Sequence, residues 1–435
     1  MTATATYNQP AFPCNYPAHW QLLRIKNLFT EIDERSETGS EELLSVSHYT
    51  GVTLKKESLE NEDDFITNAD SLEGYKKVAK GDLVINIMLA WNGSLGISPF
   101  DGITSPAYCV YRVKGNNNPE YFGYLFSTNL MKAEFRKKST GIIDSRLRLY
   151  SDKFFSLFSV VPTVDEQNQI GEYIKAQSQK IDHFITKKQR FIELLKEQRQ
   201  SVITKAITKG IKEDVNYKES KIEWLGKIPS HWKLLKLKYV GESFIGLTYS
   251  PGELVDEGEG ILVLRSSNIQ NGKYSLEDNV YVKKEIPEKL FTKKGDILLC
   301  SRNGSAELIG KNILIDEHSE GNTFGAFMTI FRSELNNYLY YFFNSNIFKS
   351  QTSLFATSTI NQLTNSILSN MKIAFPESID EQKEIIEFIK TETATIDKTI
   401  AKAEREIELI KEYKEAMIAE AVMGKAKIYN TVNAK

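Results

Sequence analysis

The chain has 435 residues, 41% hydrophobic and 11% aromatic, which is enough material for the cores of two or three domains. Its formal net charge of −2 argues against a protein that coats nucleic acid through bulk electrostatics. No apolar run long enough to span a membrane and no signal-peptide pattern is present, and three scattered cysteines form no CxxC pair. We therefore expect a cytoplasmic protein without a disulfide framework or a zinc site.

The first part of the chain predicts a disordered lead-in at residues 1–12 and an α+β domain at 13–162. Short β-prone runs alternate there with turn signals such as Asn92-Gly93, and residues 119–138 favour helix. Residues 130–153 carry seven basic and three acidic side chains. This excess favours one edge that touches nucleic acid, although ordinary surface patchiness gives the same pattern.

A long helix is predicted at residues 163–212. It follows a proline and opens with the capping box Thr163-x-x-Glu166. Apolar residues then recur at steps of three and four, which predicts a coiled-coil seam of Ile170, Ile174, Ile181, Phe184, Phe191, Leu195 and Val202. A helix of this length, at about 1.5 Å per residue, needs a partner of equal length.

The same order then repeats, with a charged linker at 213–228, a second α+β domain at 229–376, a second long helix at 377–424 and a tail at 425–435. Three matched motifs carry the repeat: Pro17-Ala-His-Trp20 with Pro229-Ser-His-Trp232, Lys80-Gly-Asp82 with Lys294-Gly-Asp296, and Asp165-Glu-Gln167 with Asp380-Glu-Gln382. The chain is thus predicted to be a tandem duplication of a domain followed by a helix.

The charges of the two helical segments favour pairing with each other. Residues 163–212 hold ten Lys or Arg and six Asp or Glu, whereas 377–427 hold nine and thirteen. Opposite surplus charges beside apolar seams favour pairing of the two copies with each other over self-pairing. We expect this pair to be an antiparallel coiled coil. Two unrelated amphipathic surface helices are the alternative.

The sequence shows no catalytic machinery. It lacks Walker A, HExxH, GxSxG and GxGxxG motifs and the Asn/Asp-Pro-Pro-Tyr/Phe tetrapeptide of amino-methyltransferases. His19 and His231 precede apolar strands and are interpreted, with the adjacent tryptophans, as core anchors. Asp82 and Asp296 follow glycine ahead of apolar strands and are interpreted as turn-forming residues. We therefore predict no catalytic residue and no metal ligand.

Together these motifs resemble the specificity (S) subunit of type I restriction-modification systems, over residues 16–424. The resemblance implies a non-catalytic subunit of a phage-defence system that reads a two-part, asymmetric DNA site with two target-recognition domains. It also implies that the paired helices act as a spacer and docking platform. The implied partners are double-stranded DNA, two methyltransferase subunits and endonuclease/translocase subunits around one copy of this chain. S-adenosylmethionine, ATP and Mg are expected in the partners and no cofactor in this chain.

We predict DNA contacts by basic residues that position phosphates and by amides, hydroxyls and arginines that read base edges. These residues are Lys137, Lys138, Arg146, Arg148, Arg265, Ser266, Asn268, Arg302, Asn303, Ser305, Thr323, Thr359, Asn361 and Gln362. Turn-forming and capping roles are the alternative for each polar residue. For the whole chain, the alternatives are a coiled-coil scaffold that binds only proteins and a fused restriction-modification enzyme.

Overall fold

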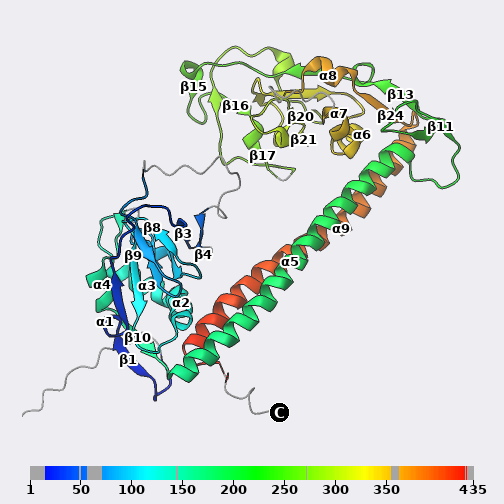
Figure 1. Cartoon of the computed structure of the whole chain (residues 1–435). Helices are drawn as coiled ribbons and strands as arrows, with labels where there is room; N and C mark the ends of the chain where they lie inside the picture. Colours follow the sequence, from blue (N-terminus) through cyan, green and yellow to red (C-terminus); the bar gives the residue numbers. More distant parts are fainter. Residues whose placement is uncertain are drawn as a thin grey trace, which may run out of the picture. The chain divides into compact units, whose positions relative to one another are not determined.

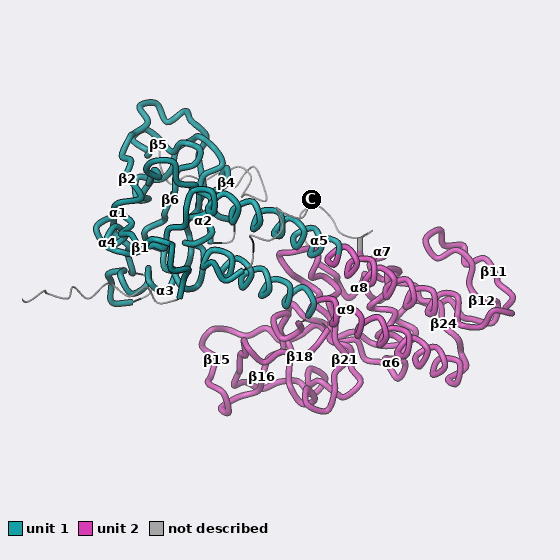
Figure 2. The backbone as a smooth tube through the Cα atoms, turned by 90° about the horizontal axis from the view of Figure 1, so that it is seen from below, with its two compact units in different colours: residues 1–187, 405–435 teal, residues 188–404 magenta. Residues whose placement is uncertain are grey.

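The structure is a computed structural model, and it describes residues 15–48, 50–55, 71–143, 146–270, 272–353, 362–426 and 428. The chain forms two compact units, which Figure 2 shows in different colours. Unit 1 contains residues 1–187 and 405–435, and unit 2 contains residues 188–404. Each unit therefore combines one mixed domain with part of each long helix. Within the described residues, no helix is long and apolar enough to cross a membrane.

The domain of unit 1 (Figure 1) contains a four-stranded antiparallel sheet. The order of its strands is β2-β9-β6-β7. These strands are β2 (Phe29–Ile32), β6 (Leu83–Ile85), β7 (Leu95–Ile97) and β9 (Cys109–Val113). Three further strand pairs are β1 (Gln21–Arg24) with β10 (Phe158–Val161), β3 (Leu44–Ser47) with β4 (Gly51–Leu54), and β5 (Lys76–Val78) with β8 (Gly102–Thr104). The helices are α1 (Ile25–Leu28), η3 (Ala90–Asn92), α2 (Pro119–Ser127), α3 (Asn129–Lys138) and α4 (Ser151–Ser156).

The helix predicted at 119–138 is divided into α2 and α3. Thr128 has extended backbone angles, and its hydroxyl accepts the amide of Met131, so this residue ends one helix and caps the next. Both helices bury an aromatic face, and Phe122, Phe126 and Phe135 lie in the same core as Phe154 of α4. Because of the break at Thr128, two helices with different directions pack against the same core.

The domain of unit 2 repeats this plan around the sheet β14-β23-β20-β21. These strands are β14 (Glu242–Ile245), β20 (Ile297–Cys300), β21 (Asn312–Leu314) and β23 (Met328–Arg332). A second sheet contains β15 (Leu254–Val255), β19 (Tyr281–Val282), β16 (Ile261–Leu264) and β22 (Thr323–Phe324). The other strand pairs are β11 (Tyr217–Glu219) with β12 (Lys227–Pro229), β13 (Lys233–Lys236) with β24 (Lys372–Phe375), and β17 (Ile269–Gln270) with β18 (Lys273–Tyr274). The helices are η5 (Leu237–Tyr239), η6 (Pro251–Glu253), η7 (Ser266–Asn268), η8 (Glu288–Leu290), η9 (Ala306–Leu308), α6 (Asn336–Phe343), α7 (Asn346–Ser353) and α8 (Asn365–Asn370).

The two aspartates of the Lys-Gly-Asp motifs are buried and form equivalent ion pairs with partly exposed arginines. Asp82 accepts two hydrogen bonds of 2.8 Å from Arg112, and Asp296 accepts bonds of 2.8 and 2.7 Å from Arg332. Each aspartate also accepts a backbone amide three residues earlier, which is the predicted turn. Because both carboxylates are saturated inside the domain, the motif stabilises the join between the sheet strands.

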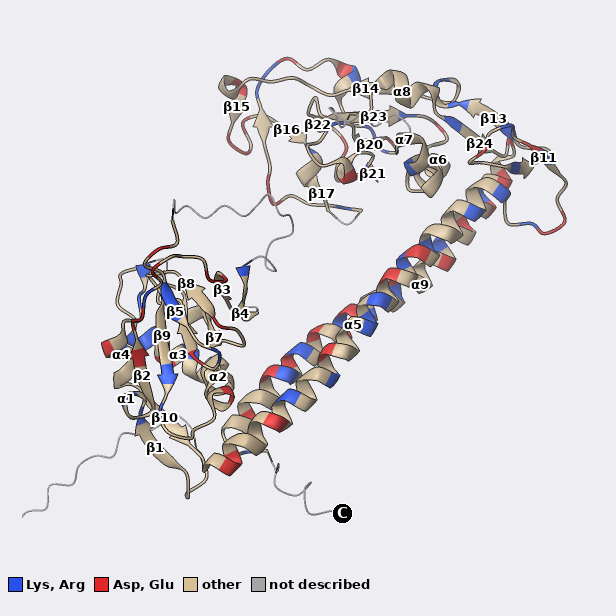
Figure 3. Cartoon of the chain, in the orientation of Figure 1, with Lys and Arg blue, Asp and Glu red and all other residues tan. Residues whose placement is uncertain are grey.

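The two long helices are α5 (Val164–Lys209) and α9 (Ile379–Val422), and they pack against each other in antiparallel directions within each unit. In unit 2, Arg199 pairs with Asp397 at 2.8 Å, and Lys212, just beyond the end of α5, pairs with Glu384 at 3.3 Å. In unit 1, Lys414 pairs with Asp182 at 2.7 Å. Basic and acidic residues are interspersed along both helices (Figure 3). The predicted antiparallel coiled coil and the α+β duplication are confirmed.

The predicted seam was wrong at Phe184 and Phe191, which are each 42% exposed. Ile185 is partly buried in the core of unit 1, and Ile192 is buried. An α-helix has 3.6 residues per turn, so a strict seven-residue pattern drifts around its surface. The buried seam therefore moves by one residue along α5, from the phenylalanines to the isoleucines that follow them.

The Asp-Glu-Gln motif joins each long helix to the start of its own domain. Glu166 accepts hydrogen bonds from Thr163 N at 2.9 Å and from Trp20 Nε1 at 3.3 Å, and it contacts His19 Nε2 at 2.7 Å. Gln167 is buried and donates to the carbonyl of Pro162 at 3.0 Å. We call this set of contacts the first joint.

The second joint is an equivalent set of contacts in unit 2. Glu381 lies 2.9 Å from His231 Nε2 and accepts a 3.0 Å hydrogen bond from Trp232 Nε1. Gln382 donates to the carbonyl of Pro376 at 2.8 Å. Both tryptophans are buried, as expected of core anchors, whereas the histidine side chains are 60% and 50% exposed.

The first joint predicts an acid-sensitive step in the stability of unit 1. Burial raises the pKa of Glu166, but hydrogen bonds from His19, Thr163 and Trp20 outweigh it and lower the pKa to about 2, from an ordinary value of 4.5. Since the pKa of the folded state is the lower one, this stabilisation is complete above about pH 4.5 and is lost as the pH falls towards 2. We expect Glu166→Gln to cost about 1.5–3 kcal/mol at pH 7 and to flatten this acid dependence. Urea unfolding of the full chain from pH 7 to 3 measures both effects, and Glu172→Gln on the exposed face of α5 is the control. An unaltered acid dependence in Glu166→Gln would contradict the assignment.

Each long helix ends against the other domain. Tyr121 of α2 donates to the carbonyl of Val422 at 3.1 Å, and Tyr338 of α6 donates to the carbonyl of Ile207 at 3.3 Å. Met417, Val422 and other residues near the end of α9 belong to the core of unit 1. Each domain is therefore held by the beginning of one long helix and the end of the other.

Candidate nucleic-acid interface

The first domain brings several predicted residues together at one end of its main sheet, which we call the first tip (residues 86–94, 136–143 and 146–149). Thr140 and Arg148 exchange two backbone hydrogen bonds of 2.9 Å, and Leu149 N donates to the carbonyl of Ile87 at 2.9 Å. These bonds hold the segment after α3 against the turn after β6. Lys137, Lys138, Arg146 and Arg148 all lie on the first tip.

The second tip (residues 301–309, 325–327, 362 and 363) is the equivalent end of the second domain. Leu363 N donates to the carbonyl of Ser301 at 2.7 Å, which repeats the bond between Leu149 and Ile87. An isolated antiparallel bridge pairs Arg302 with Gln362. The structure thus places four of the predicted residues together, namely Arg302, Asn303, Ser305 and Gln362. Gln362 is far from the other three in the sequence, so the sequence alone does not predict that they lie close together.

The predicted cations differ in their local contacts. Lys137 forms an ion pair with Glu134 at 2.6 Å, one turn earlier on α3. Arg148 donates to the carbonyl of Leu147 at 2.9 Å. Arg265 donates to the carbonyl and the carboxylate of Asp278, both at 2.8 Å. Exposed pairs of this kind hold side chains in place at little energetic cost, so they leave the cations able to exchange a carboxylate for a phosphate.

Two predicted contacts lie inside the second domain. Asn268 is fully buried, and its amide group donates to the carbonyl of Ser275 at 3.0 Å. Thr323 is also fully buried and donates to the carbonyl of Leu290 at 3.0 Å. Asn268 also accepts the amide of Arg265, so its contacts are those of a turn and cap, whereas Thr323 bonds to a segment 33 residues earlier in the chain. Ser266 is half-buried beside them, and its carbonyl accepts Lys311 Nζ at 3.2 Å.

Two further predicted residues, Thr359 and Asn361, lie outside the described residues.

Sequence reasoning missed the apolar and aromatic side chains of the tips. Ile142 and Ile143 are 98% and 54% exposed at the end of the first tip, and Phe327 is 60% exposed on the second. The guanidinium of Arg302 lies 5.5 Å from the centre of the Phe327 ring, and that of Arg136 lies 5.0 Å from the Trp91 ring. Each tip thus has an arginine within cation–π distance of an aromatic ring. The sequence does contain one sign of this exposed apolar surface, which is the pair of isoleucines in the turn after Gly141.

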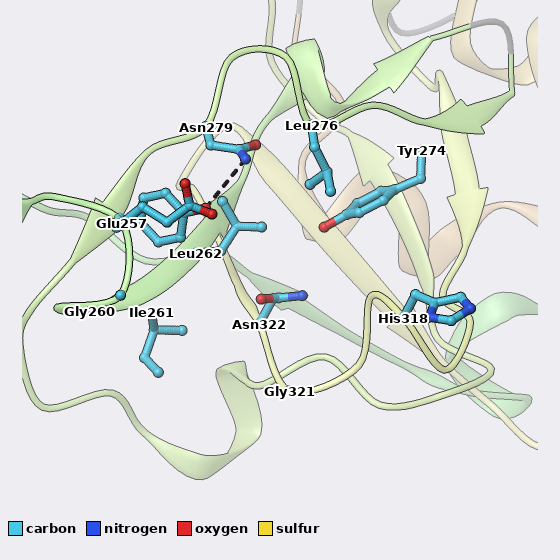
Figure 4. A pocket seen from close by; sticks show the side chains of 12 residues that line it. Glu257, Gly260, Ile261, Leu262, Tyr274, Leu276, Asn279, His318, Gly321 and Asn322 are labelled. Carbon is cyan, nitrogen blue, oxygen red and sulfur yellow. Dashed lines mark hydrogen bonds between the residues drawn. The ribbon is translucent and has the colours of Figure 1, made fainter.

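A hollow of about 400 Å³ lies at the other end of β16 from Arg265 (Figure 4). Tyr281 donates to Glu257 there at 3.0 Å, and the buried hydroxyl of Tyr274 has no hydrogen-bond partner among the described residues. Burial raises the pKa of Tyr274 to about 12. The lining has no lysine or arginine, so the hollow lacks the charge of a phosphate site. Within the described part of the chain, no group of three or more His, Cys, Asp or Glu could hold a metal ion.

The fold and the two tips define a class of protein with duplicated domains joined through paired helices. A chain from a solved structure of a type I restriction-modification system has this fold, with a TM-score of 0.71 at 13% identity over 95% of this chain and 100% of that one. The HsdS subunit of Thermoanaerobacter tengcongensis matches with a TM-score of 0.51 at 14% identity over 95% and 99%.

Sequence comparisons find similarity to the same class of protein. Residues 229–409 match the family model of the type I restriction modification DNA specificity domain. The chain is 26% identical to the MjaVIII specificity subunit of a type I restriction enzyme from Methanocaldococcus jannaschii, over 95% of this chain and 94% of the relative. The resemblance found in the sequence is therefore confirmed, and the chain is a relative of type I restriction-modification specificity subunits.

Proposed function

We propose that this chain is the DNA specificity subunit of a type I restriction-modification complex, and that each tip reads one half of a two-part DNA site. The observation that carries the proposal is the equivalence of the tips. Two copies of one domain present cations and exposed apolar or aromatic side chains at the same end of the same sheet. Such a surface combines phosphate contacts with contacts to base edges.

The joints explain how recognition and assembly are connected. Each domain contacts both long helices, so a partner bound to the helices is held at a defined position relative to the tip of the same unit. Apolar side chains are exposed on the helices, among them Leu194 of α5 and Leu409 of α9, each 47% exposed. Leu194 and Leu409 occupy equivalent positions in the repeat, which supports docking of two methyltransferase subunits.

The catalytic chemistry belongs, in this proposal, to the partners. The methyltransferase subunits would hold S-adenosylmethionine, and the endonuclease/translocase subunits would hold ATP and Mg. This chain contributes the choice of DNA sequence, in the cytoplasm where the host chromosome and invading DNA are both accessible.

Sequencing of methylated bases in a host with and without this gene tests the proposal. We expect one bipartite motif to lose its methylation when the gene is deleted and to regain it when the gene is restored. Unchanged methylation, in a host where the partner methyltransferase is active, would contradict the proposal and favour a scaffold that binds only proteins.

A further inference from the structure

Unit 1 contains a groove of about 1020 Å³ where the first domain faces the helix pair. Strand β7 and helix α2 form one wall, and α5 and α9 contribute Lys175, Ser178 and Lys414. Lys80 and Lys132 of the domain complete a set of four lysines around the groove. We call this feature the lysine groove.

The charge of the lysine groove is poorly compensated. Among the described residues that line it, Glu120 is the only acidic one. Lys414 pairs with Asp182 at 2.7 Å, but no carboxylate among the described residues lies within 4.0 Å of the ammonium groups of Lys80, Lys132 or Lys175. Like charges in a concave surface reinforce one another's potential and concentrate anions there. The groove therefore favours a ligand with several negative charges.

Glycines keep the lysine groove open. A Cβ at Gly93, whose φ is +92°, would lie 2.6 Å from Cε of Lys132 and would displace that side chain. A Cβ at Gly123 of α2 would lie 2.8 Å from Cγ1 of Ile97 on β7. Larger residues at either position would fill the wall or move the lysine, so the present shape depends on both glycines.

The equivalent place in unit 2 is bridged by hydrogen bonds. Gln200 of α5 donates to the carbonyl of Asn344 at 2.5 Å, and Thr204 accepts the amide of Asn346 at 3.3 Å. The corresponding positions of α9 carry Glu415 and Ala419, and the alanine has no side-chain hydrogen-bonding group. The hydrogen bond of Thr204 therefore has no counterpart at Ala419, but the basic character recurs in unit 2. The positions that correspond to the four lysines of the groove carry Lys294, Lys349, Lys390 and Arg199.

We propose that the lysine groove binds the sugar-phosphate backbone of DNA beside the bases that the first tip reads, an inference that rests on the proposed function. Gly93 belongs both to the groove and to the first tip. Lys132 lies one helical turn before Arg136 of the first tip, so the two cations share a face of α3. Because the tip and the groove are continuous, we favour a single polyanion that contacts both. A separate acidic protein bound in the groove is the less favoured ligand. The groove contributes affinity without sequence preference, because phosphates carry no base information.

The test uses the full chain in complex with its partner subunits. The triple variant Lys80→Gln, Lys132→Gln and Lys175→Gln is compared with Lys26→Gln, Lys180→Gln and Lys187→Gln, three exposed lysines of unit 1 outside the groove. Binding of a duplex with the methylated motif and of a random duplex is measured between 50 and 200 mM salt. We expect the groove variant to reduce the slope of log affinity against log salt by about 2 to 3, and equally for both duplexes.

Different results would contradict the groove proposal and the proposed function. If the groove variant has the same salt slope as the control variant, the groove proposal is overturned. It is also overturned if the groove variant binds DNA normally but no longer binds a partner subunit. That second result would mean that the groove holds an acidic protein surface. Failure of the unmodified complex to prefer its motif over random DNA would instead overturn the proposed function. Thermal unfolding of both variants checks that the comparison is between folded proteins.

Discussion

A chain that ends at Glu404 is expected to lose the stable fold of its first domain, although the deleted residues lie at the opposite end of the sequence. The deletion removes the part of α9 that belongs to unit 1. Met417, Val422, Met423 and Ile428 are buried in the same core as Trp20. The carbonyl of Val422, which accepts the hydroxyl of the fully buried Tyr121, is removed with them.

The size of this effect follows from the number of apolar groups exposed. Burial of each large apolar side chain contributes about 1.5–3 kcal/mol, so the four residues together approach the whole stability of a domain, about 5–15 kcal/mol. Loss of the Lys414–Asp182 pair adds little, because both groups are partly exposed. Unit 2 retains Ile385 and Ile389 of α9 in its own core and is expected to stay folded.

Hydrogen exchange measured by mass spectrometry distinguishes the two units. We expect fast exchange throughout 71–143 and protected amides in 229–353 in the shortened chain. A chain that ends at Ile428 is the control, because it keeps every described residue. Protection of 71–143 that equals the control would show that the end of α9 is dispensable for the first domain.

The sequence predicted the duplicated order because the motifs of the two copies match residue by residue. It did not predict that each domain is completed by the end of the other helix. Those contacts join residues 301 positions apart at Tyr121 and Val422, and 131 positions apart at Tyr338 and Ile207. Hydrophobic periodicity placed a seam on α5 but could not fix its phase, because the helical period and the heptad differ slightly. Charge surplus was sufficient to predict the pairing of the helices.

For the candidate interface, the sequence shows the type of each residue but not whether its side chain is buried. Arg146 and Arg302 were chosen as basic residues in loops, and the fold places them at the two tips, where their contact with DNA stays a prediction. Asn268 was chosen for the same reason, yet its side chain satisfies backbone groups inside the domain. Exposed apolar residues such as Ile142 and Phe327 look like core residues in the sequence, and only the fold shows that they face solvent.

The double variant Arg302→Ala with Asn303→Ala is expected to relax the second half of the methylated sequence and to leave the first half unchanged. Arg302 is exposed, its guanidinium lies beside the Phe327 ring, and its backbone is bridged to that of Gln362, so the segment that carries it has a defined position. An arginine held in this way can donate two hydrogen bonds to guanine, and such a pair contributes about 1–3 kcal/mol of discrimination, roughly 5- to 150-fold. Asn303 accepts the amide of Ser305 at 3.0 Å, so its loss also loosens the loop that presents Arg302.

Three single variants separate base reading from charge and from loop structure. Arg302→Lys keeps the positive charge but cannot form the planar two-bond contact, so it is expected to relax the motif almost as far as alanine does. Phe327→Ala removes the stacked ring and is expected to give a smaller loss. Lys294→Ala, which removes an exposed ion pair with Glu317 in the same domain, is the control. Methylome sequencing and competition binding with single-base substitutions give the preference at each position. If Arg302→Lys and the double variant both methylate the original sequence with unchanged affinity, the second tip does not read the DNA.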